Sequence, residues 1–295
     1  MIYTVTFNPA IDYCLYTDTL NFGKTNRSRL EKIFFGGKGI NVSRVLSNLE
    51  VENTALGFTA GFTGLELEKA LTDFGIKTDF IRLKNGMTRI NVKLKGEIET
   101  EINASGPEIT ADDIEMLFKK LDALTGGDIL VLAGSIPPTL PDNIYEMILN
   151  RLNGKNITTV VDTTKNSLLS TLKYKPFLIK PNLDELSELC EKALASDKEI
   201  AKAASLLQQK GAQNVLVSLG ADGALLLDKN GKIHRKSAAK ITPVNTVGAG
   251  DSMVAGFLAG LQNGFEYAFN LSLAAGSATA ATDDLATKEQ IEALI

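Results

Sequence analysis

Apolar and polar residues follow two different periods along this chain, and their order predicts the architecture. Short apolar runs bounded by turn residues are typical of buried strands, and they occur at 2–7, 129–133, 158–161, 177–179, 215–219 and 224–227. Between the later runs, apolar residues recur at helical spacing over 111–124, 142–152 and 184–194. Because strands and helices alternate, the sequence predicts βαβ units and an α/β fold with a parallel sheet.

One section departs from this alternation. Residues 89–102 alternate polar and apolar side chains around Lys95-Gly96-Glu97, a pattern typical of a β-hairpin. Residues 12–35 are irregular and polar. Together these segments form either a small β layer over one end of the main sheet or an antiparallel edge of that sheet. The pattern alone favours neither arrangement.

Composition restricts the class of protein. The chain has 295 residues, of which 44% are hydrophobic and 22% charged, as is ordinary for a globular protein. Its net charge of −4 argues against a nucleic-acid partner. The first residues lack a signal-peptide pattern, and no apolar run reaches membrane-spanning length. We therefore expect a cytoplasmic protein without a membrane partner.

Two scarce residue types exclude further chemistry. His234 is the only histidine, which argues against a histidine-based zinc site and against a Ser-His-Asp triad. Cys14 and Cys190 are far apart and form no CxxC motif, so we expect both thiols to be reduced and structural.

The stretch 245–256, NTVGAGDSMVAG, places small residues directly before Asp251. If a helix begins near Ala249, its first N–H groups have no intrahelical partner and point outward. Small residues let an anion approach them, and the helix dipole favours negative charge there. The sequence thus suggests an anion hole at Gly248, Ala249 and Gly250. An ordinary first-turn acid is the alternative, but it does not explain both glycines.

Two better-known glycine motifs are absent. The dinucleotide-binding G-x-G-x-x-G fails because Met253 stands at its third glycine. The P-loop pattern fails because Asp18 stands at its first glycine, although Gly23-Lys24-Thr25 supplies the ending. These departures argue against a dehydrogenase and against a P-loop enzyme.

Three further segments share a placement with the first. GGKGIN at 36–41, KPNLDE at 180–185 and SLGADG at 218–223 each end a predicted strand or start a helix. Each has an ordinary interpretation: a tight turn for the two glycine segments, and an Asn cap with a first-turn Glu for the other. Ligands of open α/β sheets bind beyond the carboxyl ends of the strands. The shared placement therefore favours one ligand site.

The four segments, in this order, resemble the signatures of the ribokinase-like (PfkB) family of carbohydrate kinases, and the resemblance covers essentially the whole chain. The first signature resembles 36–41 with Gly57, Gly61 and Gly64, and the second resembles 245–256. Both together are highly specific.

The resemblance implies one kinase domain over residues 1–295. Its expected fold is a three-layer αβα sandwich with a mostly parallel central sheet. Segments of about 12–35 and 87–104 are expected to form a small β-sheet lid inserted in it, which excludes water. In this family the lid often pairs two subunits, so the resemblance also implies a homodimer.

The resemblance further implies phosphoryl transfer from MgATP to a sugar hydroxyl. Asp251 is then the catalytic base, and the N–H groups of Gly248, Ala249 and Gly250 hold the transferring group. The implied nucleotide site comprises Lys180, Asn182, Ser218, Gly220, Ala221, Gly223 and Asn270, with Glu185 organising Mg²⁺ through water. The implied sugar-phosphate site comprises Asp12, Gly37, Lys38, Asn41, Arg89 and Ser135.

Within the family, several segments resemble the kinases of phosphorylated sugars. TVTFNPAID at 4–12, Lys38, TRINVKL at 88–94 and NASGP at 103–107 are similar to members that phosphorylate fructose 1-phosphate at its 6-hydroxyl. Lys24, Arg27, Lys38 and Arg89 supply cations for a phosphate, which arginine grips with two hydrogen bonds. Tagatose 6-phosphate and fructose 6-phosphate are alternative acceptors. A non-catalytic sensor of sugar phosphates or nucleotides is the alternative of a different class.

Overall fold

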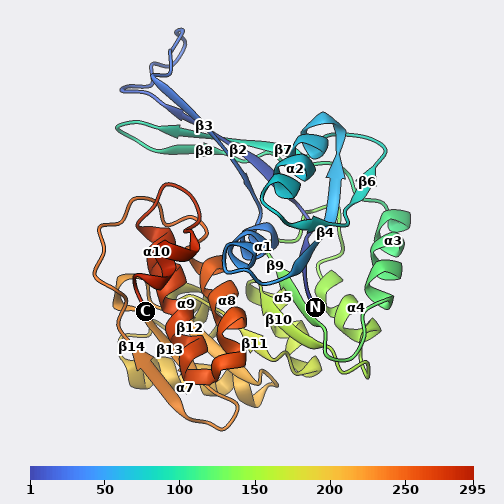
Figure 1. Cartoon of the computed structure of the whole chain (residues 1–295), viewed down its shortest axis with the longest axis vertical. Helices are drawn as coiled ribbons and strands as arrows, with labels where there is room; N and C mark the ends of the chain where they lie inside the picture. The colour runs from blue at the N-terminus through green and yellow to red at the C-terminus, as the bar shows by residue number, and fades with distance from the viewer.

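A ten-stranded sheet forms the centre of the computed structural model, which describes residues 1–295 (Figure 1). The strand order is β14-β13-β12-β11-β10-β9-β1-β4-β5, and β6 also pairs with β4. All pairings are parallel except those of β13 and β14, which are antiparallel. The strands are β1 (Ile2–Thr6), β4 (Asn53–Ala60), β5 (Lys77–Thr78), β6 (Ile81–Leu83), β9 (Ile129–Ala133), β10 (Thr158–Asp162), β11 (Leu178–Ile179), β12 (Asn214–Ser218), β13 (Ala224–Leu227) and β14 (Ile233–Lys236).

Helices cover both faces of this sheet, which gives three layers. One face carries α1 (Lys38–Asn48), α8 (Ala249–Gly260), α9 (Phe265–Ala280) and α10 (Lys288–Glu292). The other carries α3 (Ala111–Asp122), α4 (Ile144–Arg151), α5 (Lys165–Thr171), α6 (Leu183–Leu189) and α7 (Asp197–Gln209). A smaller cluster joins α2 (Gly61–Asp73) to α1 and β4, and three short 3₁₀ turns are η1 (Leu172–Tyr174), η2 (Gly220–Asp222) and η3 (Leu261–Asn263).

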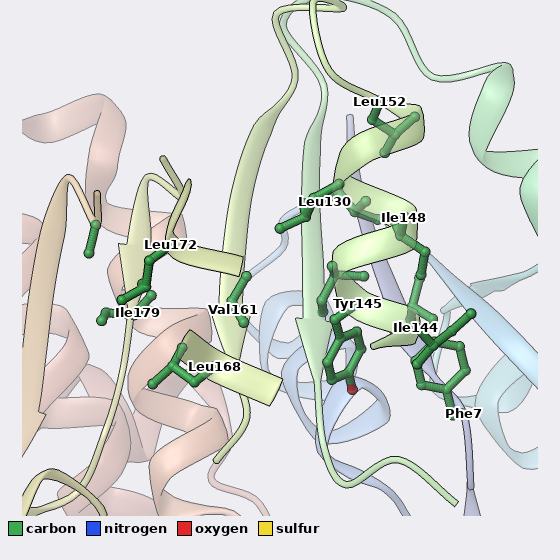
Figure 2. Packing of buried hydrophobic residues seen from close by; sticks show 14 of the residues in the cluster. Phe7, Leu130, Ile144, Tyr145, Ile148, Leu152, Val161, Leu168, Leu172 and Ile179 are labelled. Atoms are coloured by element: carbon green, nitrogen blue, oxygen red, sulfur yellow. The ribbon is translucent and has the colours of Figure 1, made fainter. Parts of the chain in front are cut away.

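Alternating side chains of the central strands enter opposite layers. Leu130 and Leu132 of β9 belong to the core under α4, whereas Val131 between them belongs to the core under α8 and α9. Figure 2 shows Leu130 level with Ile148 of α4. Because these strands are buried on both faces, they appear in the sequence as continuous apolar runs. The predicted α/β sandwich is confirmed.

A second, four-stranded sheet lies beside the first and projects from the body (Figure 1). Its order is β3-β2-β7-β8, with bounds β2 (Ala10–Tyr16), β3 (Leu30–Gly36), β7 (Arg89–Lys95) and β8 (Thr100–Ile102). β7 and β8 form the predicted hairpin. The separate β layer is therefore the correct alternative, and the antiparallel edge is wrong.

Two local predictions differ from the structure. Much of the segment expected to be irregular over 12–35 forms the antiparallel pair β2 and β3. Much of β3 is exposed, so its sequence lacks a clear alternation. The helix predicted over 184–194 ends at Leu189, shortly before Glu191 adopts a positive φ of 51°. None of the helices has the length and apolarity that crossing a bilayer requires.

Candidate active site

Asp251 lies in the first turn of α8, and the structure brings the first glycine segment to it. Helix α8 begins at Ala249, as predicted, and Gly248 caps it with a φ of 81°. Asn41 of α1 donates from Nδ2 to Asp251 Oδ2 at 2.8 Å. A Cβ on Gly248 would lie 2.6 Å from Leu285 Cδ2 and 3.5 Å from Asn41 Nδ2. Two segments some 210 residues apart therefore meet at one carboxylate.

Two lysines flank this carboxylate and share a buried partner. Lys38 Nζ lies 3.7 Å from Asp162 Oδ1, and Lys180 Nζ lies 3.6 Å from Asp162 Oδ2. The Asp162 side chain is 1% exposed and ends β10. A Cβ on Gly250 would lie 2.9 Å from Lys180 Nζ, so the glycine leaves room for this ammonium beside the proposed anion hole. The arrangement holds two ammonium groups, partly balanced by Asp162, where a phosphoryl group would pass.

Burial and, after it, the charge of the nearby Asp162 carboxylate raise the pKa of Asp251 to about 6. Lys38, the Asn41 hydrogen bond and Lys180 oppose the shift. Burial lowers the pKa of Lys38, but Asp162, Asp251 and Glu185 raise it overall, so Lys38 stays protonated. A carboxylate with a pKa near 6 is a better proton acceptor at neutral pH than an ordinary aspartate.

This pKa predicts the acid limb of the rate profile. If Asp251 acts as a base, kcat/KM should be level above about pH 7 and fall tenfold per unit below about pH 6. Protonation of the Asp251 carboxylate removes the acceptor of the substrate proton, so the rate falls as the pH is lowered. Initial rates between about pH 5 and 8, in buffers of constant ionic strength, measure this limb. Rates that stay level down to about pH 5 would contradict the burial effect.

A cavity of about 750 Å³ joins the anion hole to the predicted nucleotide segments. Its lining includes Asn182, Ser218, Gly220, Ala221, Gly223 and Gly250. Helix α9 lines it through Leu273, Gly276, Ser277 and Ala280. Two predicted nucleotide residues are not in the lining. Lys180 instead approaches Gly250, and Asn270 accepts a hydrogen bond from Lys236.

Glu185 and Asn182 form a capping box at the start of α6. Asn182 Oδ1 accepts from Glu185 N at 2.7 Å, and Glu185 Oε2 accepts from Asn182 N at 2.9 Å. No three His, Cys, Asp or Glu side chains gather to hold a metal by themselves. A single carboxylate, Glu185, fits a Mg²⁺ ion that binds together with nucleotide phosphates and keeps most of its water ligands.

A second cavity, of about 580 Å³, lies under the four-stranded sheet. Asp12, Gly37 and Asn41 line it together with Lys93 and Arg44. Lys38, Arg89 and Ser135 lie outside its lining, and Ser135 is exposed at the end of β9. Lys24 and Arg27 lie in the exposed loop between β2 and β3.

Arg89 has unusual hydrogen-bonding freedom for a half-buried side chain. Its Nη1 donates to Ala104 O at 3.3 Å, and its buried Nε has no partner. Burial lowers the pKa of Arg89, while the charge of Asp12 opposes this. Buried donors are normally paired, so the free N–H groups suit an incoming phosphate.

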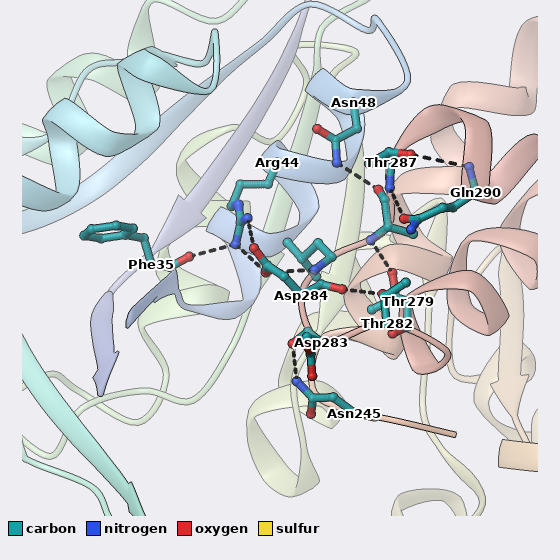
Figure 3. Close-up of polar contacts among 12 residues, drawn as sticks. Phe35, Arg44, Asn48, Asn245, Thr279, Thr282, Asp283, Asp284, Thr287 and Gln290 are labelled. Carbon is teal, nitrogen blue, oxygen red and sulfur yellow. Dashed lines mark hydrogen bonds and ion pairs between the residues drawn. The ribbon is translucent and has the colours of Figure 1, made fainter. Parts of the chain in front are cut away.

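The loop that follows α9 holds the anion-hole segment in place (Figure 3). Arg44 of α1 forms a bidentate pair with Asp284, at 3.0 and 2.6 Å, and also donates to Phe35 O. Asn245 Nδ2 donates to Asp283 O at 2.9 Å. The Arg44–Asp284 pair joins elements 240 residues apart, and sequence reasoning missed it because neither residue lies in a motif.

Asp162, Asn91 and Lys93 were also missed. The sequence did contain a signal for Asp162 as a site residue. It is an acidic residue directly after the apolar run 158–161, at the carboxyl end of a parallel strand. Asn91 and Lys93 belong to the TRINVKL segment, whose hairpin pattern was recognised without assigning these side chains.

An open α/β sheet with an anion hole and a buried carboxylate beside its strand ends defines a site suited to phosphoryl transfer. The pfkB family carbohydrate kinase model matches residues 5–291. This chain belongs to that family.

Known relatives extend the comparison. A 1-phosphofructokinase of Bacillus subtilis is 44% identical, over 100% of this chain and 97% of its own. A D-tagatose-1-phosphate kinase of Bacillus licheniformis is 37% identical, over 99% and 96%. The crystal structure of Escherichia coli phosphofructokinase-2 with substrates and products has a TM-score of 0.93 and 28% identity, over 99% and 97%. The chain is thus a 1-phosphofructokinase-like carbohydrate kinase.

Proposed function

We propose that this protein transfers the γ-phosphoryl group of ATP to the 6-hydroxyl of fructose 1-phosphate, which gives fructose 1,6-bisphosphate. The observation that carries this proposal is the buried Asp251 at the start of α8, beside glycines that leave the helix N-terminus open. Similarity to a 1-phosphofructokinase over the full chain supports the choice of substrate.

In the proposed mechanism, Asp251 accepts the proton of the attacking hydroxyl while Asn41 holds its carboxylate. The N–H groups of Gly248, Ala249 and Gly250 stabilise charge on the transferring group. Lys38 and Lys180, both held by Asp162, add positive charge on either side. Mg²⁺ bound with ATP would neutralise phosphate charge, and Glu185 would orient its water ligands.

We assign the substrate phosphate to Arg89, because its buried Nε has no partner and its Nη1 makes only one long hydrogen bond. Asp12, Gly37, Lys38, Asn41 and Ser135 complete the proposed sugar-phosphate site. ATP would occupy the cavity of about 750 Å³. There it would contact Asn182, Ser218, Gly220, Ala221 and Gly223. Lys180 would contact its phosphates, and Asn270 lies about one turn before the part of α9 that lines the cavity.

Tagatose 1-phosphate is the second candidate acceptor, since a relative 37% identical is a D-tagatose-1-phosphate kinase. It differs from fructose 1-phosphate only in the configuration of one ring hydroxyl. Both relatives are named for sugars with the phosphate on carbon 1, which supports these two acceptors over tagatose 6-phosphate and fructose 6-phosphate.

ADP production measured with these four sugar phosphates, side by side, tests the proposal. We expect the highest kcat/KM with fructose 1-phosphate. A higher value with tagatose 1-phosphate would keep the mechanism and change the acceptor. ATP binding without turnover of any of the four would support the non-catalytic sensor instead.

We also propose that the protein is a homodimer paired through the four-stranded sheet. That sheet projects from the body (Figure 1). Its exposed apolar side chains are Leu30, Ile33, Ile98 and Ile102. Large exposed apolar side chains on such an element are typical of an interface. Light scattering should give twice the chain mass of 31.7 kDa, and the double change Ile33→Lys with Ile102→Lys should give monomers. A monomeric wild type would contradict this.

We propose the cytoplasm as the compartment, because Cys14 and Cys190 are both free thiols.

A further inference from the structure

Strand β7 carries two buried polar side chains that contact Asp12 of β2. Asn91 Nδ2 donates to Asp12 Oδ1 at 2.8 Å, and Lys93 Nζ lies 3.2 Å from Asp12 Oδ2. β2 and β7 are parallel, with Asp12 opposite Asn91, so strand pairing itself brings these groups together. The mechanism above uses neither Asn91 nor Lys93.

We propose that Asn91 and Lys93 are positioning residues that hold the Asp12 carboxylate in one orientation, as the acceptor of hydrogen bonds from the ring hydroxyls of a ketohexose 1-phosphate. Each carboxylate oxygen accepts two hydrogen bonds, so one position on each oxygen remains for the sugar. This inference rests on the proposed function and adds the side chains that prepare Asp12 for it.

The positive charge of Lys93 also favours binding of a phosphorylated substrate near Asp12. More acidic than basic side chains line the cavity of about 580 Å³, and the substrate carries a phosphate. An uncompensated Asp12 would repel that substrate. Lys93, which is 8% exposed, cancels this charge at close range. Burial lowers the pKa of Lys93, but Asp12 and then Glu101 raise it overall, so the cation persists.

Asn91 also connects Asp12 to the proposed phosphate site. Its Oδ1 accepts from Ala104 N at 3.3 Å, and Ala104 O accepts from Arg89 Nη1 at 3.3 Å. One amide side chain thus joins the hydroxyl acceptor to the loop that contacts Arg89. The buried Lys93–Asp12 pair is itself weak evidence for a role in stability, since apolar side chains often stabilise such a position at least as well.

A double-mutant cycle between Lys93 and Asp12 tests the proposal. We would measure calorimetrically the binding of fructose 1-phosphate, and separately of ATP, to the full-length wild type, Lys93→Met, Asp12→Asn and the double variant. Lys93→Met should weaken sugar-phosphate binding about tenfold or more, with ATP binding unchanged within about twofold. In the Asp12→Asn background it should add no loss, because Lys93 acts through Asp12.

Lys173→Met is the matched control. Lys173 pairs with Glu146 at 2.6 Å and lines neither cavity. Its loss removes the same charge and should change sugar-phosphate binding by less than about twofold. Lys93→Arg keeps the charge and should retain most of the affinity.

The outcomes separate the possible roles. Independent losses from Lys93→Met and Asp12→Asn would mean that Lys93 contacts the sugar phosphate itself, which overturns the proposal. Unchanged binding in Lys93→Met would show a structural ion pair only. If that variant does not fold, the same cycle with Asn91→Ala decides, since it removes the contact to the other oxygen. A wild type that binds none of the four sugar phosphates would instead refute the proposed function.

Discussion

Asp251→Asn is expected to lower kcat by about 10²- to 10⁴-fold while the protein stays folded. The amide keeps the shape of the carboxylate and can still accept from Asn41 Nδ2, but it cannot take the substrate proton. Binding of ATP and of the sugar phosphate should change little. Steady-state rates and calorimetric binding measure both parts, and near-normal turnover would remove Asp251 from the mechanism.

The same variant should be more stable than the wild type at pH 8. Burial and Asp162 raise the pKa of Asp251 to about 6 in the folded state, above its ordinary value of 3.8. The stability that this shift contributes is fully present below about pH 4 and is lost as pH rises through about 6. Removing the ionised form should therefore add about 1–3 kcal/mol at pH 8, measured by denaturant unfolding.

Asp112→Asn is the matched control for an ordinary first-turn acid. Asp112 is exposed in the first turn of α3, where its charge interacts favourably with the helix dipole. Its loss should cost at most about 1 kcal/mol and leave kcat unchanged. If Asp251→Asn and Asp112→Asn changed stability and kcat equally, Asp251 would be an ordinary first-turn acid rather than a catalytic base.

Gly57→Ala is expected to destabilise the fold by roughly 3 kcal/mol or more. Gly57 of β4 pairs with Thr6 of β1 and has a φ of 143°. A Cβ there would overlap the carbonyl oxygen of Thr6 and lie 2.9 Å from its carbonyl carbon. Because both atoms are backbone in the central sheet, β1 and β4 would have to separate.

The damage should also reach the site, since Thr6 contacts the first glycine segment. A Cβ on Gly37 would lie 2.7 Å from Thr6 Cγ2, and one on Gly39 would lie 2.7 Å from the carbonyl oxygen of Val5.

Gly127→Ala is the control that separates backbone strain from steric overlap, because Gly127 has a φ of 94° with no atom within 4 Å of its Cβ position. It should cost roughly 1 kcal/mol. Chemical denaturation measures the free energy of unfolding of both variants. If Gly57→Ala lost as little stability as Gly127→Ala, the predicted effect of steric overlap would be wrong.

Sequence reasoning succeeded where a local pattern has a single physical cause. The continuous apolar runs of β9 and β10 follow from burial on both faces, so their positions were predictable. The start of α8 at Ala249 followed from small residues before a helical run. It failed at β3, whose exposure removes the alternation, and at the end of α6, which the backbone of Glu191 decides.

By itself, the sequence determined the family, the layered fold and the carboxylate beside an open helix N-terminus. Each of these depends on residues close together in the chain or on motifs in a set order. Only the tertiary structure decided which charges meet. Asp162 holds Lys38 and Lys180 because β10 and β11 end, and α1 begins, at the same edge of the sheet. The pKa of Asp251 depends on that meeting and on burial, since electrostatic interactions follow distance in space rather than along the chain.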